Sequence, residues 1–311
     1  MTLAVGVDLG GTNGRAALVD VERGELVGAD AKAAVTDRSP AAVAELVGTL
    51  VDRVDPKGER AGVGIGFAGM LRGYTGIVVN APNFGWREVD LRSLLRKRLG
   101  DKTELYNDLN AIAYGETRFG SARGVRDVFF CFVGTGVGAG IVTDGRLYAG
   151  SNHLAGEFGH IKVIYNGRLC GCGQRGCLEA YTSGANLKAR AREDLQKTTS
   201  LAVELAGGLD QLHAGHLDEA AARGDRYASE LLEHAGSLLG IALANAVTTL
   251  NPSRLIMGGG VWEKSAELRK HSLRYLRETI NVPSLEGFEI IDSTLGDRAG
   301  VLGASALIAG K

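Results

Sequence analysis

The architecture of this chain can be traced outward from LAVGVDLGGTNGRAALVD, residues 3–20. Small and branched apolar residues fill Leu3–Asp8, which predicts a buried strand. The glycine-rich turn after it leads to a second strand around Arg15–Asp20, and a turn at Glu22–Glu25 leads to a third strand near Leu26–Ala31. Neighbouring strands joined by short turns form a β-meander, so this end of the chain is not a βαβ unit.

The same pattern returns far downstream. Val128–Val133 is an apolar strand, Gly134–Gly136 is a turn and Val137–Thr143 is a strand. Asp144-Gly145 then predicts a hairpin turn into another strand that begins at Arg146–Tyr148. An internal duplication with such a long period indicates two related domains that face a shared cleft. Chance similarity between two glycine-containing hairpins is the alternative explanation.

Helical spacing of apolar residues marks the segments between these strands. A long helix is predicted from a cap at Asp225 to about Leu250, where Asn251-Pro252 stops it. A short strand, Arg254–Met257, follows and opens into a run of glycines. The other predicted elements are helices at Pro40–Val54, Leu91–Leu99 and Ala299–Ala309, the last made of small residues that allow close packing, and a strand at Val63–Ala68.

Composition excludes several classes of protein. The chain has 311 residues, 45% of them hydrophobic, which is enough for two domains with a large core. Its formal net charge is -1 and no basic block stands out, which argues against nucleic acid or an anionic membrane surface as partner. The N-terminus does not resemble a signal peptide, and no long unbroken apolar run is present. We therefore expect a cytoplasmic protein with no membrane partner.

Three glycine-containing turns carry candidate nucleotide-binding groups. Glycine lets backbone N–H groups face a phosphate, Thr12 adds a hydroxyl donor, and Asp8 at a strand end can hold a hydrated Mg²⁺. Each turn alone is better explained as a plain hairpin turn, whereas the three together favour a nucleotide. The residues concerned are Asp8, Gly10, Gly11, Thr12, Asn13, Gly134, Thr135, Gly136, Gly258, Gly259 and Gly260, the last three leaving room for adenine or ribose.

Two other nucleotide-binding folds are disfavoured. The chain has no G-x-x-x-x-G-K-[ST] motif, which argues against a P-loop NTPase. The run GTGVGAG, residues 134–140, alternates glycine along one face of a strand, and no helical pattern follows it. It is therefore a poor dinucleotide-binding fingerprint.

A cysteine cluster indicates a metal site. Of the four cysteines, Cys131 lies within the apolar run VFFCFVG and is interpreted as a core residue. The other three lie in CGCGQRGC, residues 170–177, an odd number for disulfides. Together with His160, ten residues upstream, Cys170, Cys172 and Cys177 complete the four ligands of a tetrahedral Zn²⁺. Buried free thiols are the alternative, and a nucleic-acid zinc knuckle lacks the expected basic and aromatic neighbours.

The metal would also orient polar groups around it. If one ring nitrogen of His160 binds zinc, the other becomes a fixed N–H donor. Glu157 lies three residues before His160, and Glu179 lies two residues after Cys177. One donor and two carboxylate acceptors around one point suit a ligand rich in hydroxyl groups.

A candidate catalytic carboxylate follows the short strand-like segment Thr103–Tyr106. Asp108 stands at the strand end, just before helical residues 111–116, and could accept a proton from an attacking hydroxyl. Phosphoryl transfer needs little more than such a carboxylate, phosphate-binding turns and Mg²⁺. From residues alone, Asp108 as a helix N-cap is an equally good explanation. PNFGW, residues 82–86, is interpreted as a loop.

Taken together, these motifs resemble those of the ROK family of sugar kinases, its bacterial glucokinases in particular, over essentially the whole chain. The cysteine cluster with its upstream GEFGH is highly specific, and the glycine turns are less so. The matching motifs are DLGGT (8–12), PNFGW (82–86), ND (107–108), GTGVGAG (134–140), GEFGH (156–160), CGCGQRGCLE (170–179) and GGGV (258–261).

The resemblance implies an α/β chain with the two-lobed actin/hexokinase-like (ribonuclease H-like) fold, with mixed sheets and a ligand cleft between the lobes. Residues 1–114 with 298–311 would form the small lobe, and 115–297 the large one. It implies ATP-dependent phosphorylation of a hexose at the 6-hydroxyl, first of all glucose, with Mg²⁺ and structural Zn²⁺, and Asp108 as general base. The matching sugar-contacting residues are Asn83, Asn107, Asp108, Glu157, His160 and Glu179, and the zinc ligands are His160, Cys170, Cys172 and Cys177.

Other functions remain open at this stage. The sugar could instead be mannose, N-acetylglucosamine, N-acetylmannosamine or allose, and polyphosphate could replace ATP. The family also includes sugar-responsive repressors, but the first strand here begins at about Leu3 and leaves no room before it for a helix-turn-helix. A catalytically silent sensor is disfavoured by the intact Asp8, Thr12 and Asp108. A homodimer is implied by the resemblance, and the segment Lys188–Gly224 matches no motif.

Overall fold

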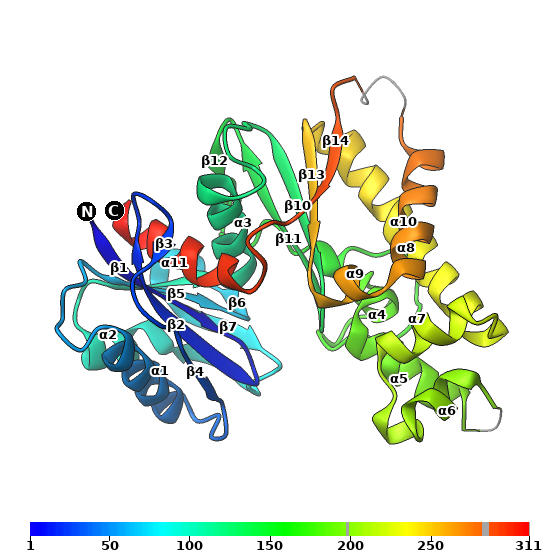
Figure 1. Ribbon diagram of the computed structural model, residues 1–311, viewed down its shortest axis with the longest axis horizontal. Coiled ribbons are helices and arrows are strands. Elements are labelled where there is room, and N and C mark those ends of the chain that lie inside the picture. Colours follow the sequence, from blue (N-terminus) through cyan, green and yellow to red (C-terminus); the bar gives the residue numbers. More distant parts are fainter. Residues whose placement is uncertain (197–198, 282–285, 311) are drawn as a thin grey trace. The chain divides into compact units, whose positions relative to one another are not determined.

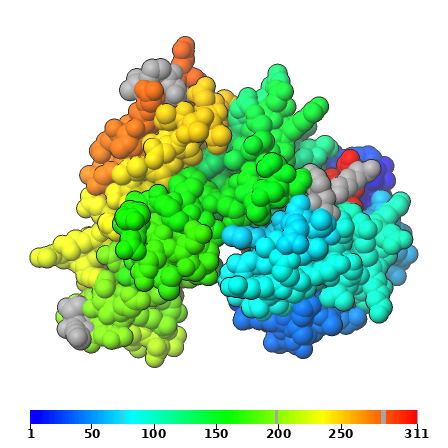
Figure 2. All heavy atoms as spheres, turned by 180° about the vertical axis from the view of Figure 1, so that it is seen from behind, coloured from blue at the N-terminus to red at the C-terminus, as the bar shows by residue number. Residues whose placement is uncertain are grey.

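The computed structural model describes residues 1–196, 199–281 and 286–310. The chain forms two compact units, which Figure 1 shows as ribbons and Figure 2 as atoms, coloured along the sequence. The first unit comprises Met1–Val128, Gly140–Gly156 and Ser293–Lys311. The second comprises Phe129–Ala139 and Glu157–Asp292.

The sheet of the first unit is built around the N-terminal hairpin. Its strands are ordered β3-β2-β1-β5-β9, with β4 also paired to β2. Strands β1 and β2 are antiparallel, whereas β1, β5 and β9 run parallel. The strands are β1 (Leu3–Leu9), β2 (Asn13–Asp20), β3 (Glu25–Leu26), β4 (Ala31–Ala34), β5 (Val63–Phe67) and β9 (Thr103–Asn107).

The predicted meander is confirmed, with one correction. The single third strand expected near Leu26–Ala31 is in fact two short strands, β3 and β4, and both pair with β2. Gly28 lies between them with φ +83°, a left-handed conformation that interrupts an extended strand. The sheet is therefore mixed, with a meander at one side and parallel strands at the other.

Helices cover both faces of this sheet. The predicted helices α1 (Pro40–Val54) and α2 (Leu91–Leu99) form on one face, over a large apolar cluster that includes Val5, Val47 and Ile65. Helix α11 (Ala299–Ala309) lies on the other face. It packs closely because β1 and β5 have glycine there: a Cβ at Gly6 or Gly64 would overlap the carbonyl of Val301 or of Ala304.

Helix α3 (Asp108–Phe119) runs beside α11, and a Cβ at Gly303 would overlap the carbonyl of Ala111. A small sheet, ordered β6-β7-β8, completes this part of the unit. Residues 82–85 form the turn between β7 and β8, as the PNFGW motif predicts. The small strands are β6 (Met70–Leu71), β7 (Ile77–Ala81) and β8 (Trp86–Asp90).

The second sheet repeats the order of the first. Its order is β12-β11-β10-β13-β14, and that of the first sheet is β3-β2-β1-β5-β9. In both sheets three consecutive strands lie side by side, and two strands from later in the chain follow next to the first of the three. Strands β13 and β14 are parallel. This shared topology supports the duplication inferred from the sequence. The strands are β10 (Val128–Val133), β11 (Val137–Thr143), β12 (Arg146–Leu147), β13 (Arg254–Gly258) and β14 (Glu289–Asp292).

The long helix α8 (Arg226–Leu250) belongs to the second unit. Asp225 caps it by accepting the Ala228 N–H at 2.8 Å, and Asn251 ends it in a left-handed conformation, as predicted. Helix α10 (Ala266–Thr279) packs along α8, where Gly236 and Gly240 leave no space for a Cβ. By length and composition α8 is also apolar enough to cross a membrane, but more than half of that window is buried in the protein.

The unassigned segment Lys188–Gly224 is largely helical. It contains the end of α5 (Gly184–Asp194), α6 (Leu201–Ala206) and α7 (Ala214–Ala222). Residues 197 and 198 of this segment lie outside the described residues. Two short helices, α4 (Glu179–Thr182) and α9 (Gly260–Lys264), follow the cysteine cluster and the glycine run respectively.

Candidate active site and metal centre

Polar groups of the first unit gather at one edge of its sheet. Asp8 pairs with Gly66 of β5, which in turn pairs with Tyr106 of β9. The three strands are parallel, so their carboxyl ends meet at the same edge. The turn at Gly10–Asn13 leaves β1 there, and Asn107 and Asp108 leave β9 there. The sheet thus brings together the first glycine turn and the candidate catalytic aspartate.

Asn107, rather than Asp108, caps helix α3. The Oδ1 atom of Asn107 accepts the Asn110 N–H at 3.1 Å, and its Nδ2 donates to the Gly69 carbonyl at 3.4 Å. Asp108 is the first helical residue, and its Oδ1 accepts the Leu109 N–H at 2.9 Å. The N-cap interpretation of Asp108 is therefore wrong. The carboxylate lies instead in the first turn of α3.

Asn83 lies beside the first glycine turn. A Cβ at Gly11 would lie 2.6 Å from the Asn83 Cβ, so glycine is needed for this approach. The loop that carries Asn83 is anchored by Phe84 and Trp86, whose rings are 4.7 Å apart, centroid to centroid. The Trp86 ring also stacks on Phe67 of β5. Asn83 is thus held at the same edge as Asp8 and Asn107.

Asp8 is electrostatically unusual. Burial raises the pKa of its carboxyl, the nearby Arg15 opposes that effect, and Asp297 adds to it. Gly300 of α11 packs against the carboxyl group, because a Cβ there would lie 2.8 Å from the Asp8 Cγ. Burial thus disfavours the ionised carboxylate of Asp8, and a bound cation such as Mg²⁺ would stabilise that ionised form.

Sequence reasoning missed Arg15. It stands directly opposite Asp8 in the β1–β2 register, donates from Nε to the Asp30 Oδ2 at 2.6 Å, and donates from Nη1 to the Asp297 carbonyl at 2.6 Å. Counting residues outward from the tight GGTN turn would have placed it across from Asp8. Arg15 therefore places a positive charge close to Asp8, the candidate Mg²⁺ ligand.

Glu116, also missed, is a fully buried carboxylate near the far end of α3. It accepts hydrogen bonds from the backbone N–H groups of Ser121, Thr294 and Leu295 at 2.8, 3.0 and 2.9 Å. The hydroxyls of Ser121 and Ser293 also donate to it. These donors are neutral, so Glu116 ties α3 to the chain that leads into α11 without a matching cation. Its position in an amphipathic helix gave no signal for this role.

In the second unit, the four predicted metal ligands come together. The ligand atoms of His160, Cys170, Cys172 and Cys177 all lie within 4.8 Å of one another. The Cys172 and Cys177 sulfurs are 3.7 Å apart, and the Cys170 sulfur is 3.8 Å from the His160 Nδ1. Zinc–sulfur bonds of about 2.3 Å in a tetrahedron require ligand atoms about 3.8 Å apart. The donor set and its spacing therefore fit zinc.

The loop around these ligands is folded by its own backbone. Isolated β-bridges join Lys162 to Cys177 and Leu169 to Arg175. Gly176 has φ +78°, and a Cβ there would overlap the carbonyl of Ile164. Burial raises the pKa of the Cys170 thiol, so a cation is needed to hold it as a thiolate. Cys131 is a separate buried residue of β10, as expected, and burial raises its pKa to about 12.

The predicted hydroxyl-binding groups surround the ligand cluster. With Nδ1 of His160 facing the thiols, its Nε2 lies 3.8 Å from the Glu157 Oε2. Burial raises the pKa of Glu157; the neighbouring Glu179 acts in the same direction and His160 in the opposite one. The Oε1 of Glu179 is 3.8 Å from the Cys170 sulfur. The carboxyl groups of Glu157 and Glu179 thus lie close to the metal ligands, of which His160 is one.

Glu179 also links this cluster to the second glycine turn. Its Oε2 accepts the Val137 N–H at 2.9 Å, directly after Gly134–Gly136. The Gly134 carbonyl accepts the Gly184 N–H at 2.9 Å. Gly259, with φ +94°, packs against Val133, where a Cβ would lie 2.6 Å from the carbonyl oxygen. The second and third glycine turns and the metal loop therefore form one connected group within the second unit.

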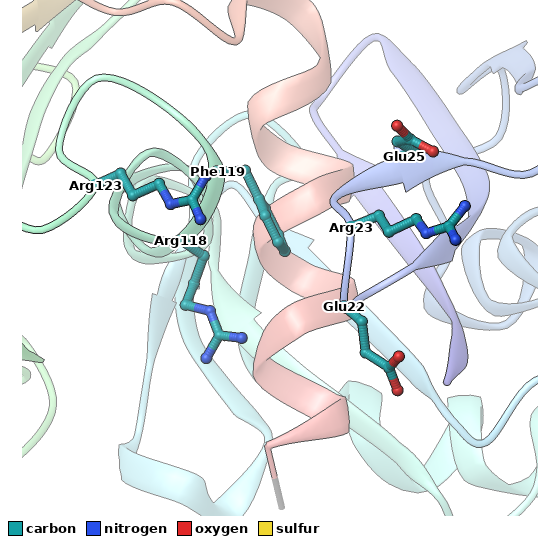
Figure 3. A pocket seen from close by; sticks show the side chains of 6 residues that line it. All are labelled: Glu22, Arg23, Glu25, Arg118, Phe119 and Arg123. Atoms are coloured by element: carbon teal, nitrogen blue, oxygen red, sulfur yellow. The ribbon is translucent and has the colours of Figure 1, made fainter. Parts of the chain in front are cut away.

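A separate cavity of about 530 Å³ opens in the first unit (Figure 3). Figure 3 shows Phe119 between Arg118 and Arg123 on one side and the Glu22–Glu25 turn on the other. The residues that line this cavity are Glu22, Arg23, Glu25, Arg118, Phe119 and Arg123. None of the predicted site residues is among them.

Comparison with known proteins identifies the class. The model of the ROK family matches residues 4–311, and the chain belongs to this family. The chain is 36% identical over 307 residues to the glucokinase of Thermotoga maritima, covering 98% of this chain and 96% of that protein. The predicted α/β fold and the resemblance to ROK sugar kinases are thereby confirmed.

A solved structure and a regulator extend the comparison. The structure of a ROK family glucokinase from Streptomyces griseus, in complex with glucose and AMPPNP, is 33% identical, with a TM-score of 0.83 and coverage of 99% of this chain and 100% of that one. The xylose repressor of Caldicellulosiruptor bescii is 32% identical over 81% of this chain, but the match covers only 63% of the repressor. The two glucokinases are thus matched over nearly their whole length, whereas the xylose repressor is matched over part of its length.

Proposed function

We propose that this protein is an ATP-dependent hexose kinase that phosphorylates the 6-hydroxyl of D-glucose. The observation that carries this proposal is the shared sheet edge that joins Asp108, in the first turn of α3, to Asp8 and the Gly10–Asn13 turn. A proton acceptor and a phosphate-binding turn on one rigid sheet are what phosphoryl transfer requires. The similarity to glucokinases, which extends over nearly the whole chain, supports glucose as the sugar.

The residues divide the reaction as follows. Asp108 accepts the proton of the sugar 6-hydroxyl while that oxygen attacks the γ-phosphorus of ATP and the bond to the ADP oxygen breaks. Asp8 would hold Mg²⁺, and Gly10, Gly11, Thr12 and Asn13 would donate to the phosphates. In the second unit, the turns at Gly134–Gly136 and Gly258–Gly260 bind the rest of the nucleotide.

Sugar recognition is assigned to six residues. Asn83, Asn107 and Asp108 belong to the first unit, and Glu157, His160 and Glu179 to the second. Each offers a fixed donor or acceptor, and a hydroxyl left unpaired by the wrong sugar epimer costs binding energy in the transition state. Zinc on His160, Cys170, Cys172 and Cys177 fixes the imidazole and the loop that leads to Glu179, without entering the chemistry.

The setting of the enzyme is part of the same proposal. We expect a cytoplasmic homodimer whose partners are sugar and ATP, with no nucleic acid or membrane. The lobe boundaries inferred from the sequence, 1–114 with 298–311 against 115–297, are kept as proposed functional lobes. A repressor function is less well supported, because the similarity to the xylose repressor covers a smaller share of both chains.

Replacing Asp108 tests the assignment directly. In Asp108→Asn, turnover should fall by about 10²–10⁴-fold, the usual contribution of a general base. Glucose affinity, measured by calorimetry, should change by no more than a few-fold. Asp101→Asn, an exposed carboxylate in the turn before β9, is the matched control and should keep its turnover. Near-normal ADP release by Asp108→Asn would refute the role of Asp108.

The substrates are tested with a panel. Glucose, mannose, N-acetylglucosamine, N-acetylmannosamine and allose are compared by kcat/KM, each with ATP and with polyphosphate. We expect the highest kcat/KM for glucose with ATP. A higher value for another sugar would keep the kinase and replace the substrate, and absence of any ADP release would favour a sensor.

A further inference from the structure

One lysine contacts the ligand cluster of the second unit. The Nζ of Lys162 donates to the Cys177 sulfur at 3.0 Å and to the His160 carbonyl at 3.1 Å. The backbones of Lys162 and Cys177 also pair in an antiparallel β-bridge. A single ammonium group therefore joins the first and the last of the four ligands. The sequence motif gave no reason to single out Lys162.

The charge of the cluster explains why a cation belongs there. Zn²⁺ with three thiolates and a neutral imidazole has a net charge of about -1. Cys177 is fully buried, and burial makes an uncompensated negative charge costly. The ammonium of Lys162 brings the total to about zero and supplies a charge-assisted N–H···S hydrogen bond.

The neighbouring cations are engaged elsewhere. Residues 158–178 contain Lys162, Arg168 and Arg175 and no Asp or Glu. The guanidinium of Arg168 bonds to Glu193 at 2.6 Å, and that of Arg175 donates to the Gly167 carbonyl at 3.2 Å. Among residues 158–178, which the structure describes throughout, Lys162 is the cationic side chain that donates a hydrogen bond to a ligand sulfur.

We propose that Lys162 is a positioning residue of the metal centre, which neutralises the zinc–thiolate cluster through Cys177 and thereby keeps the metal bound. This inference rests on the proposed zinc site and adds to it a residue outside the ligand set. Without the ammonium, the Cys177 thiolate carries more charge, and competing chelators and protons gain access to it. The expected consequence is faster metal loss with the four ligands unchanged.

The test compares four full-length proteins loaded with zinc: wild type, Lys162→Met, Lys162→Arg and Lys264→Met. Met keeps the length of the aliphatic stem without the charge, and Arg keeps a charged donor. Lys264, an exposed residue of α9 in the same unit, controls for the loss of one positive charge. Zinc transfer to a colorimetric chelator should be about 10–100-fold faster in Lys162→Met, the usual effect of losing such an outer partner. Lys162→Arg and Lys264→Met should stay close to wild type.

A spectroscopic readout separates charge from packing. Each protein is reloaded with Co²⁺, whose thiolate charge-transfer band reports electron density on sulfur. In Lys162→Met this band should shift to lower energy, since a thiolate that has lost its hydrogen-bond donor is a better electron donor. In Lys162→Arg the shift should be largely reversed. A role in packing alone would leave the band in place.

The outcomes distinguish this inference from the zinc site itself. Wild-type protein that binds neither zinc nor cobalt would overturn the proposed metal centre. Metal-loaded wild type and Lys162→Met that release zinc at the same rate would overturn the role of Lys162 and leave the metal centre standing. Faster release in Lys162→Met with an unshifted cobalt band would also overturn it.

Discussion

The polar edge of the first unit and the metal loop of the second unit position their side chains by different means. At the edge, Asp8 and Asn107 stand at the ends of buried parallel strands, and Asp108 begins a helix that packs against α11. The backbone hydrogen bonds of the sheet and a large apolar core fix these residues. Their geometry needs no ligand.

The metal loop has little apolar support. The fully buried part of the apolar cluster beneath it is Cys170, Cys177, Ala180 and Tyr181, two of which are themselves proposed ligands, and partly buried residues pack against it: Val163, Ile164, Cys172 and Leu238. Tyr165 is 99% exposed and Leu169 is 61% exposed, so these large side chains contribute little to burial. Cross-links between side chains must therefore replace a core. The comparison teaches that one candidate site is held by the fold and the other by its own ligands.

Among the tests that compare the two regions, removing zinc should have the largest effect. Chelation should lower kcat/KM for glucose by about 100-fold, because Glu157, His160 and Glu179 lose their fixed positions. Hydrogen exchange should accelerate in residues 157–182 and stay unchanged in β1 and α3. Readdition of zinc should restore both. Equal acceleration in both regions would contradict the comparison, since it would make the metal a support of the whole chain.

The two tryptophans allow the units to be followed separately. The chain has two, and Trp86 belongs to the first unit while Trp262 belongs to the second. A Trp262→Phe background thus leaves Trp86 as the fluorescent reporter of the first unit. Urea denaturation of the first unit can be followed in this background by Trp86 fluorescence.

A smaller effect is expected from Glu116, which should matter to the first unit alone. Glu116→Ala leaves several buried donors around residues 121 and 293–295 without an acceptor. The free energy of unfolding should fall by about 2–4 kcal/mol, measured by urea denaturation with Trp86 fluorescence. Zinc affinity should not change. An unchanged denaturation midpoint would show that water replaces the carboxylate, and Glu230→Ala, on an exposed face of α8, is the control.

Many features of these two regions were predictable from the sequence, and the reasons differ between the units. The cysteine loop was the most readable part, because three cysteines and one histidine at this spacing are the donor set typical of a structural zinc site. The helix cap at Asp225 and the glycine-rich strands were also predictable, since they obey local rules. The metal ligands are indeed found together.

Long-range contacts were less predictable. Nothing local distinguishes Glu116 from other helical glutamates, because most of its donors are about 180 residues away in sequence. The sequence allowed Asp108 as the cap of α3 as an alternative to its catalytic role, because Asn107 and Asp108 are adjacent and both residue types cap helices. Strand pairing resolved this choice by extending β9 to Asn107. The roles of Asn83 and Asp108 in binding sugar stay predictions.

Asp8→Asn should have the smallest effect on stability, and that effect should have the opposite sign. Burial raises the pKa of Asp8 above its usual 3.8, so the native state holds this proton more tightly than the unfolded state does. Stability therefore falls as pH rises through the native pKa, and at neutral pH the ionised carboxylate is a cost. Asp8→Asn removes that cost, and we expect a modest rise in the urea midpoint at pH about 7 that shrinks toward pH about 4.

The same substitution should reduce turnover by about 100-fold, because a neutral amide binds Mg²⁺ weakly. Stability and activity would then move in opposite directions at one residue, as expected where a fold retains a strained group for its chemistry. Asp30→Asn is an informative partner variant, since it removes the carboxylate on the other side of Arg15 and leaves Asp8 in place. A lower midpoint in Asp8→Asn would mean that Arg15 outweighs burial, and the edge would then be held by an ion pair as well as by the sheet.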